Sequence, residues 1–176
     1  MYKGKNKTAL MSQKCIKEAF FALLKEKNFQ DITISDLCKK ADISRQTFYS
    51  LFKNKENILI YELKHTYPFA MCQYNEDVTL QKLCTSFSSY LNENYCFIKL
   101  LIDNDYGQLL YQMFYQSLLH CHCDMRDEAA IKDEYFASFM AGGMLSITKT
   151  YVTKEKREQS FIEKITYELF SGTFFK

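Results

Sequence analysis

Apolar residues in the first third of the chain recur at intervals of three and four positions, which is the spacing of one face of an α-helix. The longest such segment spans residues 8–27, and its apolar positions are Ile16, Ala19, Phe20, Leu23 and Leu24. Asn28 is expected to stop this helix in a left-handed conformation, which asparagine tolerates. With Phe29 and Ile32 tucked beneath the core, this helix is predicted to be a scaffold that covers the backs of the next two.

Two shorter helices, joined by a tight turn, are predicted between residues 33 and 52. Thr33 and Asp36 form a capping-box pattern, and Ser44 is placed to cap the second helix. The apolar positions that we expect to be buried are Ile34, Leu37, Cys38 and Ala41 in the first helix and Phe48, Leu51 and Phe52 in the second. With Asp42 and Ile43 as the turn, this is the organisation of a helix-turn-helix motif.

The other face of the second short helix carries hydrogen-bonding side chains, which is what reading base edges in a major groove requires. Base contacts are expected from Arg45, Gln46, Thr47 and Ser50, because arginine suits guanine and glutamine suits adenine. Contacts to phosphates, which position a domain without specifying a sequence, are expected from Thr33, Ser44, Tyr49, Lys53 and Lys55. The alternative is a three-helix module that binds no nucleic acid.

The rest of the chain also shows a helical pattern and no alternating strand pattern, so the predicted fold class is all-α. Asn54 is expected to cap a fourth helix that ends or bends at Pro68, the only proline. Further helices are predicted over residues 78–93, 95–103, 106–121, 128–152 and 157–171. The predicted domains are a helix-turn-helix domain with an N-terminal arm at 1–54, a linker helix at 55–68, and a helical bundle for regulation and dimerisation at 69–176.

The residues from Thr33 to Glu56, with Leu59, resemble the N-terminal domain of the TetR family of bacterial transcription regulators. The resemblance rests on Ala41-Asp42-Ile43-Ser44, Thr47-Phe48-Tyr49, Phe52 and Lys53-Asn54-Lys55-Glu56, and it is specific over about residues 8 to 64. Asp42 departs from the family, which usually has glycine in the turn. Aspartate tolerates a left-handed backbone better than most residues, so we expect the turn to be kept.

The resemblance implies that the last two helices pair with their copies in a second subunit as a four-helix bundle. The expected interface residues are Ile131, Gly142, Ser146, Ile162, Ile165 and Leu169. The alternative is that these stripes close the core of a single chain, and periodicity does not separate the two arrangements.

Charge is divided unevenly along the chain, although the formal net charge is only +2. Residues 1–65 carry 13 Lys and Arg against 7 Asp and Glu, whereas residues 66–176 carry 10 against 14. The basic part coincides with the helix-turn-helix, which favours a polyanionic partner for that part alone. A lysine-rich surface that is merely well solvated is the simpler alternative.

Aromatic residues after position 66 are candidates for lining an effector pocket, as the regulatory domains of the family often have: Tyr90, Phe97, Tyr111, Phe114, Tyr115, Tyr135 and Phe139. The alternative is that these residues are ordinary core. Metal binding is not expected, but His120 and Cys123 share a helix face and are candidates for a metal site, while Cys121 and Cys123 are candidates for a thiol sensor.

Several classes of protein are disfavoured. The seven cysteines form no paired framework and the first residues are not an apolar leader, so a cytoplasmic protein is expected. No uncharged run reads as a membrane span. Phosphate loops, metalloprotease motifs and nucleophile elbows are not found, so neither an enzyme nor a cofactor is expected.

The sequence therefore predicts a homodimeric DNA-binding transcription regulator, most simply a repressor that binds a palindromic operator and is released by an effector. Two alternatives stay open. One is a regulator controlled by a protein partner instead of a small molecule, and the other is a metal or thiol sensor that uses the segment from His120 to Cys123.

Overall fold

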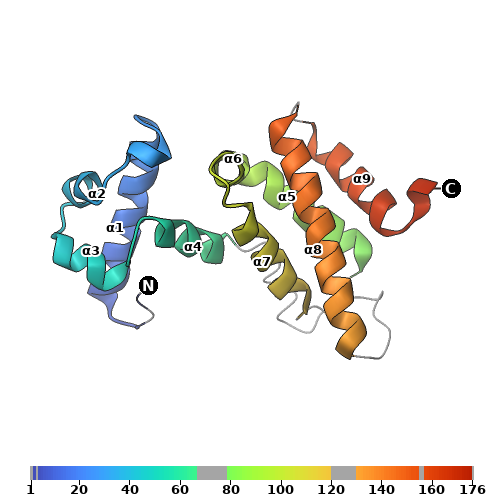
Figure 1. Cartoon of the computed structure of the whole chain (residues 1–176), viewed down its shortest axis with the longest axis horizontal. Helices are drawn as coiled ribbons and strands as arrows, with labels where there is room; N and C mark the ends of the chain where they lie inside the picture. Colours follow the sequence, from blue (N-terminus) through green and yellow to red (C-terminus); the bar gives the residue numbers. More distant parts are fainter. Residues whose placement is uncertain (1, 3, 67–78, 120–129, 155–156, 176) are drawn as a thin grey trace. The chain divides into compact units, whose positions relative to one another are not determined.

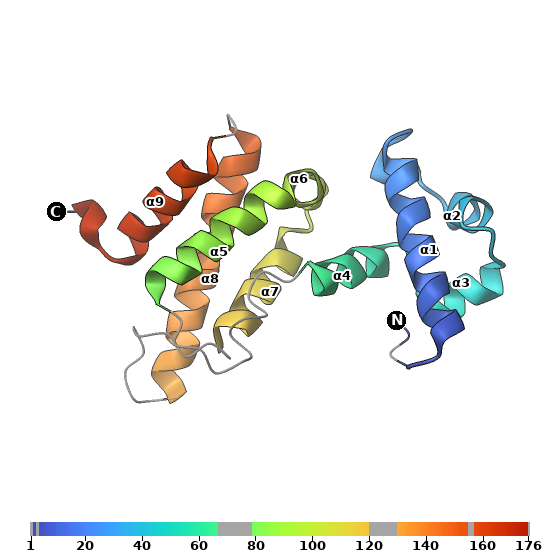
Figure 2. The same ribbon diagram turned by 180° about the vertical axis from the view of Figure 1, so that it is seen from behind.

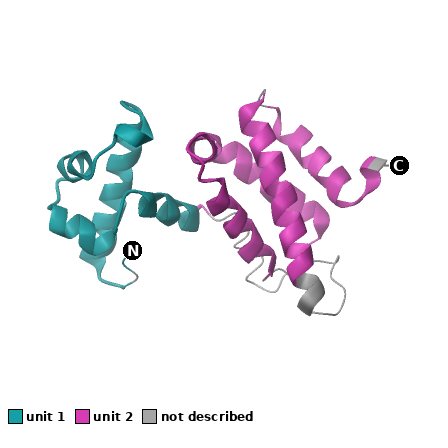
Figure 3. Cartoon of the chain, viewed as in Figure 1, with its two compact units in different colours: residues 1–65 teal, residues 66–176 magenta. Residues whose placement is uncertain are grey.

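The computed structural model describes residues 2, 4–66, 79–119, 130–154 and 157–175, and the side chains of all of these except 130–133 and 175. The chain divides into two compact units, Met1–His65 and Thr66–Lys176 (Figure 3). Pro68, the predicted end of the linker helix, lies outside the described residues. The predicted domain limits at residues 54 and 68 stay predictions.

Unit 1 is a small helical domain built on one long helix (Figure 1). Its elements are α1 (Lys7–Leu24), the 3-10 turn η1 (Phe29–Asp31), α2 (Ile34–Lys40), α3 (Arg45–Leu51) and α4 (Glu56–His65). Helix α1 packs against α2, α3 and α4, as expected of a scaffold. The centre of the unit holds fully buried side chains: Ile16, Phe20, Ile32, Leu37, Phe48, Phe52, Ile58 and Leu59.

The end of α1 differs from the sequence prediction. The helix ends at Leu24 with Lys25 still in a right-handed helical conformation, and Asn28 is extended at φ −64° and ψ 152°. The predicted left-handed stop at Asn28 is therefore wrong. Instead the chain leaves α1 through backbone bonds from Glu26 and Lys27 to the carbonyl of Leu23, and Phe29 then enters the core at 2% exposure.

Ion pairs hold the scaffold helix and its exit to the neighbouring helices. Lys17 of α1 lies 3.1 Å from Glu62 of α4. Beyond α1, the Lys27 ammonium lies 2.6 Å from the Asp36 carboxylate, and Lys40 lies 2.8 Å from Glu26. The hydrogen bond from Lys27 lowers the pKa of Asp36 well below its ordinary range, and bonds from Thr33 lower this pKa further. This pair therefore favours the folded domain at neutral pH and loses its effect as the carboxyl protonates in acid.

Unit 2 is a bundle of helices: α5 (Leu80–Glu93), α6 (Tyr95–Asp103), α7 (Gly107–Leu119), α8 (Ala130–Thr153) and α9 (Gln159–Phe170), followed by the 3-10 turn η3 (Thr173–Phe175). Helix α7 runs along α8 and α5 runs along α9 (Figures 1 and 2). The described core includes Phe87, Leu91, Ile98, Leu101, Leu110, Phe114, Met140 and Met144. The rings of Phe87 and Phe114 meet edge to face at 5.6 Å.

The described residues contain helices and turns and no strand, which confirms the all-α prediction. The described helix bounds of unit 2 lie within two residues of those predicted from periodicity. None of the helices in the described ranges combines the length and the apolar character that a membrane crossing needs.

Candidate nucleic-acid interface and regulatory surfaces

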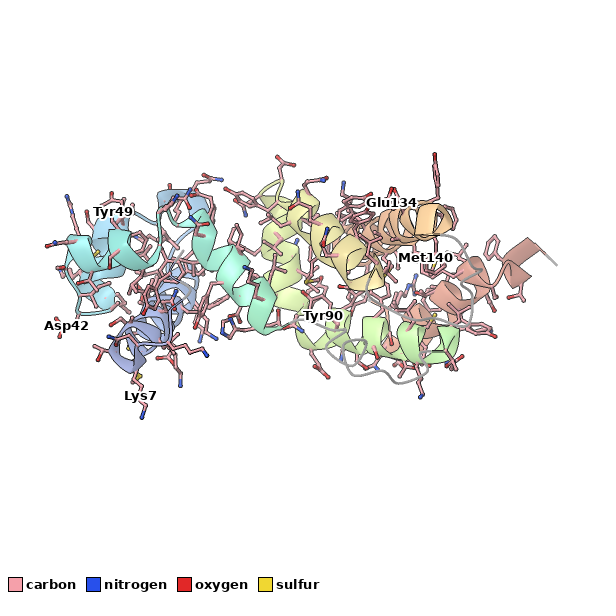
Figure 4. All side chains as sticks on the ribbon, turned by 90° about the horizontal axis from the view of Figure 1, so that it is seen from below. Lys7, Asp42, Tyr49, Tyr90, Glu134 and Met140 are labelled. Atoms are coloured by element: carbon pink, nitrogen blue, oxygen red, sulfur yellow. The ribbon has the colours of Figure 1, made fainter. Side chains whose placement is uncertain are left out.

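The turn between α2 and α3 is held by the caps that the sequence predicts. The backbone N–H of Asp36 donates to the Thr33 hydroxyl at 3.1 Å, and the N–H of Thr33 donates to the Asp36 carboxylate at 2.9 Å. The N–H of Thr47 donates to the Ser44 hydroxyl at 3.0 Å, so Ser44 caps α3. Asp42 takes φ +52°, the left-handed conformation expected of this turn, and its side chain projects from the domain (Figure 4).

Helix α3 has one buried face and one open face. Phe48 and Leu51 are buried, followed by Phe52 just after the helix. Arg45, Gln46, Tyr49 and Ser50 are exposed and Thr47 is half-buried, so the five polar residues lie on the side away from the core. Tyr49 is 54% exposed and points outward in Figure 4. A short helix that presents hydrogen-bonding side chains to solvent has the form needed to enter a major groove.

The polar side chains of this face differ in how firmly they are held. The Arg45 guanidinium donates to the hydroxyl of Ser35 in α2 at 2.5 Å, so the Arg45 side chain extends from α3 to α2. The hydroxyls of Ser44 and Thr47 lie 2.9 Å apart, and the Ser50 hydroxyl donates to the Thr47 carbonyl at 2.8 Å. Gln46 and Tyr49 stand exposed on the same helix.

Lys53 and Lys55, just before α4, have different surroundings. Lys53 is exposed. The Lys55 ammonium donates to three backbone carbonyls, those of Phe29 at 2.8 Å, Gln30 at 3.1 Å and Ile32 at 3.1 Å, and lies 4.5 Å from the centre of the Phe29 ring. The structure thus gives Lys55 a bridging position between α4 and the segment before α2, which the sequence pattern did not indicate.

The N-terminal arm is attached near the end of α3, another feature that sequence reasoning missed. The backbone N–H of Tyr2 donates to the carbonyl of Leu51 at 2.9 Å. The Gln13 side chain, which is 1% exposed, donates to the carbonyl of Tyr2 at 3.3 Å. The sequence offered one signal for this contact, because Gln13 lies three residues before Ile16 on the apolar face of the helix. A glutamine buried on that face needs a hydrogen-bond partner.

Comparison with known proteins agrees with this geometry. Residues 16–61 match the family model described as bacterial regulatory proteins, tetR family. The match covers the second half of the scaffold helix α1, the helix-turn-helix and the first part of α4. The match confirms the resemblance to the TetR family that was noted from the sequence of the N-terminal part of the chain.

Individual relatives are transcription regulators. The chain is 30% identical over 91 residues to the dhaKLM operon transcriptional activator DhaS of Lactococcus lactis, a match that spans 52% of this chain and about half, 49%, of that protein. A solved structure of the dihydroxyacetone kinase operon activator DhaS has a TM-score of 0.60 at 22% identity, with 92% and 93% of the two chains covered. A TetR regulator from Streptococcus agalactiae has a TM-score of 0.63 at 21% identity, with 93% and 95% covered. These structures show the same fold.

The predicted effector-pocket residues separate into three groups in unit 2. Tyr90, Phe97 and Phe114 are buried in the core. Tyr111, Tyr115 and Tyr135 line an open groove of about 780 Å³ between α7 and α8. Phe139 is 71% exposed and does not line this groove.

The predicted dimer residues lie mainly on the outer side of α8 and α9. Gly142 and Ser146 are exposed, and the pro-Cβ position of Gly142 meets open space. A second groove, of about 410 Å³, is lined by Ser146, Ile162, Ile165 and Leu169 together with Phe161 and neighbouring residues. Ile162 is only 5% exposed and also belongs to the core of its own unit. The side chain of Ile131 lies outside the described part.

The predicted metal or thiol cluster, His120 to Cys123, lies outside the described residues. Within the described ranges no group of three metal-ligating side chains occurs. Cys15, Cys38, Cys84 and Cys96 are not joined in disulfide bonds, and burial raises the pKa of the Cys38 thiol.

Proposed function

We propose that the protein regulates transcription as a homodimer that binds a palindromic DNA operator through α3. The observation that carries this proposal is the outward polar face of α3, which is held on a capped helix-turn-helix in the basic part of the chain. Arg45, Gln46, Thr47 and Ser50 are the proposed base contacts, and the proposed phosphate contacts are Thr33, Ser44, Tyr49 and Lys53. Lys55, expected from the sequence to hold a phosphate, is left out of this set because its ammonium already donates to three backbone carbonyls. The chain acts in the cytoplasm, where chromosomal DNA is found, and performs no catalytic step.

The proposed dimer interface is the outer side of α8 and α9. Phe139 of α8 and Phe161 of α9 are 71% and 52% exposed, and Leu169 is 36% exposed. Gly142 and Ser146 lie between the aromatic residues and leave room for a second helix at close range. Exposed apolar area of this kind favours a protein partner, and a second copy supplies the two-fold symmetry that an inverted repeat requires.

The proposed regulation is repression that an effector relieves. An effector that favours a spacing of the two α3 helices unsuited to both half-sites lowers operator affinity, and by linkage the operator lowers effector affinity. Activation is the second candidate, because the relative DhaS from Lactococcus lactis is named a transcriptional activator.

A reporter gene placed behind a DNA site that the purified protein binds tests whether the protein represses or activates transcription. Repression predicts that deleting the gene for this protein raises reporter expression, and activation predicts a fall. Unchanged expression, with a reporter whose operator binds the purified protein, would contradict both.

A further inference from the structure

We propose that the groove between α7 and α8 binds an organic cation, such as a quaternary ammonium or a protonated amine that also carries a hydrogen-bonding group. The inference names the ligand class of the proposed effector and rests on that proposal for its regulatory consequence. Binding itself is a property of unit 2 and can be measured without DNA.

The groove has the size of a small-molecule site. Its volume of about 780 Å³ lies within the range of about 300 to 1,000 Å³ typical of ligand pockets. Helix α7 supplies Gln108, Tyr111, Gln112, Tyr115 and Gln116, and α8 supplies Glu134, Tyr135 and Ser138. All of these lining side chains carry a hydrogen-bonding group, so the groove offers several polar contacts to a ligand.

Tyrosine rings give the groove faces that attract positive charge. Tyr111 and Tyr115 lie one helical turn apart and stack with their centroids 6.1 Å apart and their planes 13° from parallel. The hydroxyls of Tyr111 and Ser138 are 3.0 Å apart, so a hydrogen bond fixes the Tyr111 ring against α8. Tyr135 is 76% exposed and lines the α8 side. Ring faces stabilise a cation within about 6 Å of their centroids.

Charge selects the sign of the ligand. Among the described residues that line this groove, Glu134, labelled in Figure 4, is the only ionised side chain, and none is a lysine, arginine or histidine. An anion would therefore meet a carboxylate with no counter-charge, whereas a cation gains both the carboxylate and the rings. The α8–α9 groove has the opposite character, since Lys154 and Arg157 line it.

The glutamines of the groove further restrict the class of ligand that it would bind. Gln108, Gln112 and Gln116 are exposed and follow one another by one helical turn each along α7. An amide side chain both donates and accepts hydrogen bonds. A ligand with a hydroxyl or amide beside its positive nitrogen therefore satisfies more of this groove than a bare alkylammonium does.

Titration calorimetry of the whole protein with choline and with its uncharged carbon analogue dimethylbutanol tests the inference. The two probes have the same shape and hydroxyl and differ in the charged centre. We expect choline to bind about fivefold more tightly, which corresponds to the upper end of cation–π stabilisation at exposed sites. Glu134→Gln and Tyr135→Ala should each remove most of this difference in affinity, because the first removes the carboxylate and the second removes a ring face. Both residues are exposed, so neither substitution should disturb the core. Glu158→Gln is the matched control, since Glu158 is an exposed carboxylate at the start of α9 that does not line the groove.

Two outcomes overturn the inference: equal affinity for both probes, or no binding of choline at about 10 mM, the weak end of small-ligand affinity. A Tyr135→Ala protein that dissociates into monomers would also overturn it, because the groove would then be covered by the second copy. If choline binds but leaves operator affinity unchanged, the site stands and its effector role fails. Failure of the protein to bind any operator would count against the proposed function without touching the cation site.

Discussion

At the scale of single residues, the turn of the helix-turn-helix places Asp42 in a left-handed backbone conformation that aspartate does not prefer. Asp42 takes φ +52°, where most side chains crowd the following carbonyl. We expect Asp42→Gly to keep the free energy of unfolding within about 1 kcal/mol, because glycine relieves strain but gains freedom in the unfolded chain. Asp42→Val should lower it by about 1 to 2 kcal/mol, since a β-branched residue fits this region poorly. Urea denaturation measures both, and a valine variant as stable as the parent would contradict the assigned strain.

Lys55 is the residue whose role the structure changes most. Its ammonium already donates to the carbonyls of Phe29, Gln30 and Ile32, so we expect it to fix the start of α4 against the segment before α2. Lys55→Gln should lower the melting temperature and leave the salt dependence of operator binding nearly unchanged. Lys53→Gln, at an exposed neighbouring position, should leave the melting temperature unchanged and reduce the salt slope by about one for each subunit, or about two for the dimer. If Lys55→Gln reduces the slope and spares stability, Lys55 holds a phosphate.

At the scale of elements, α3 is expected to carry sequence specificity. Arg45→Ala should cost about 1 to 3 kcal/mol of operator affinity for each half-site and relax selection at one base pair in each half-site. Because the Arg45 guanidinium also bonds Ser35, Ser35→Ala is the control, and it should leave base preference unchanged. Binding to a set of single-base operator variants measures both proteins. An equal loss on all sequences would remove Arg45 from the base-reading residues.

Helix α8 is expected to carry dimerisation. The pro-Cβ position of Gly142 meets open space in the single chain, whereas that of Gly143 comes within 2.8 Å of the Phe170 ring of α9. Gly142→Arg should therefore fold normally and sediment as a monomer, because a long charged side chain would enter the interface between the copies. Asn92→Arg, on the exposed side of α5, should remain dimeric. A dimeric Gly142→Arg protein would place the interface elsewhere.

The helices were largely predictable from the sequence, for identifiable reasons. Thr33, Asp36 and Ser44 are strong caps, and their predicted bonds are present. The helices of unit 2 have apolar stripes and few glycines or prolines, so their ends follow the pattern closely. The prediction of a left-handed stop at Asn28 was wrong because α1 ends before this residue. Asparagine tolerates a left-handed backbone but does not require one.

The arrangement of faces was not predictable in the same way. Periodicity placed the aromatic residues of unit 2 on helices, but it did not distinguish buried Phe114 from the groove residue Tyr111 and the exposed Phe139. All three are aromatic residues in helices with similar patterns of neighbouring residues. The bridge made by Lys55 joins residues more than twenty positions apart, which a local pattern does not reveal. Such contacts depend on how helices pack, and packing is set by the whole unit.

At the scale of the whole molecule, we propose that unit 1 reads DNA and that unit 2 dimerises and binds the effector. In the proposed dimer, two copies related by a two-fold axis present two α3 helices, so each proposed phosphate contact is doubled. We therefore expect affinity for the operator to fall steeply with salt concentration. The more acidic unit, residues 66–176, contributes no comparable attraction for DNA.

The central claim is that this chain reads DNA as a symmetric dimer through α3. Selection of binding sites from a randomised duplex library with the purified protein tests it most directly, with native mass spectrometry of the selected complex. The account predicts an inverted repeat whose half-site centres lie about one helical turn, or a multiple of it, apart, with two-fold symmetric protein bound. Selection of no sequence, or of one asymmetric site bound by a single chain, would contradict it.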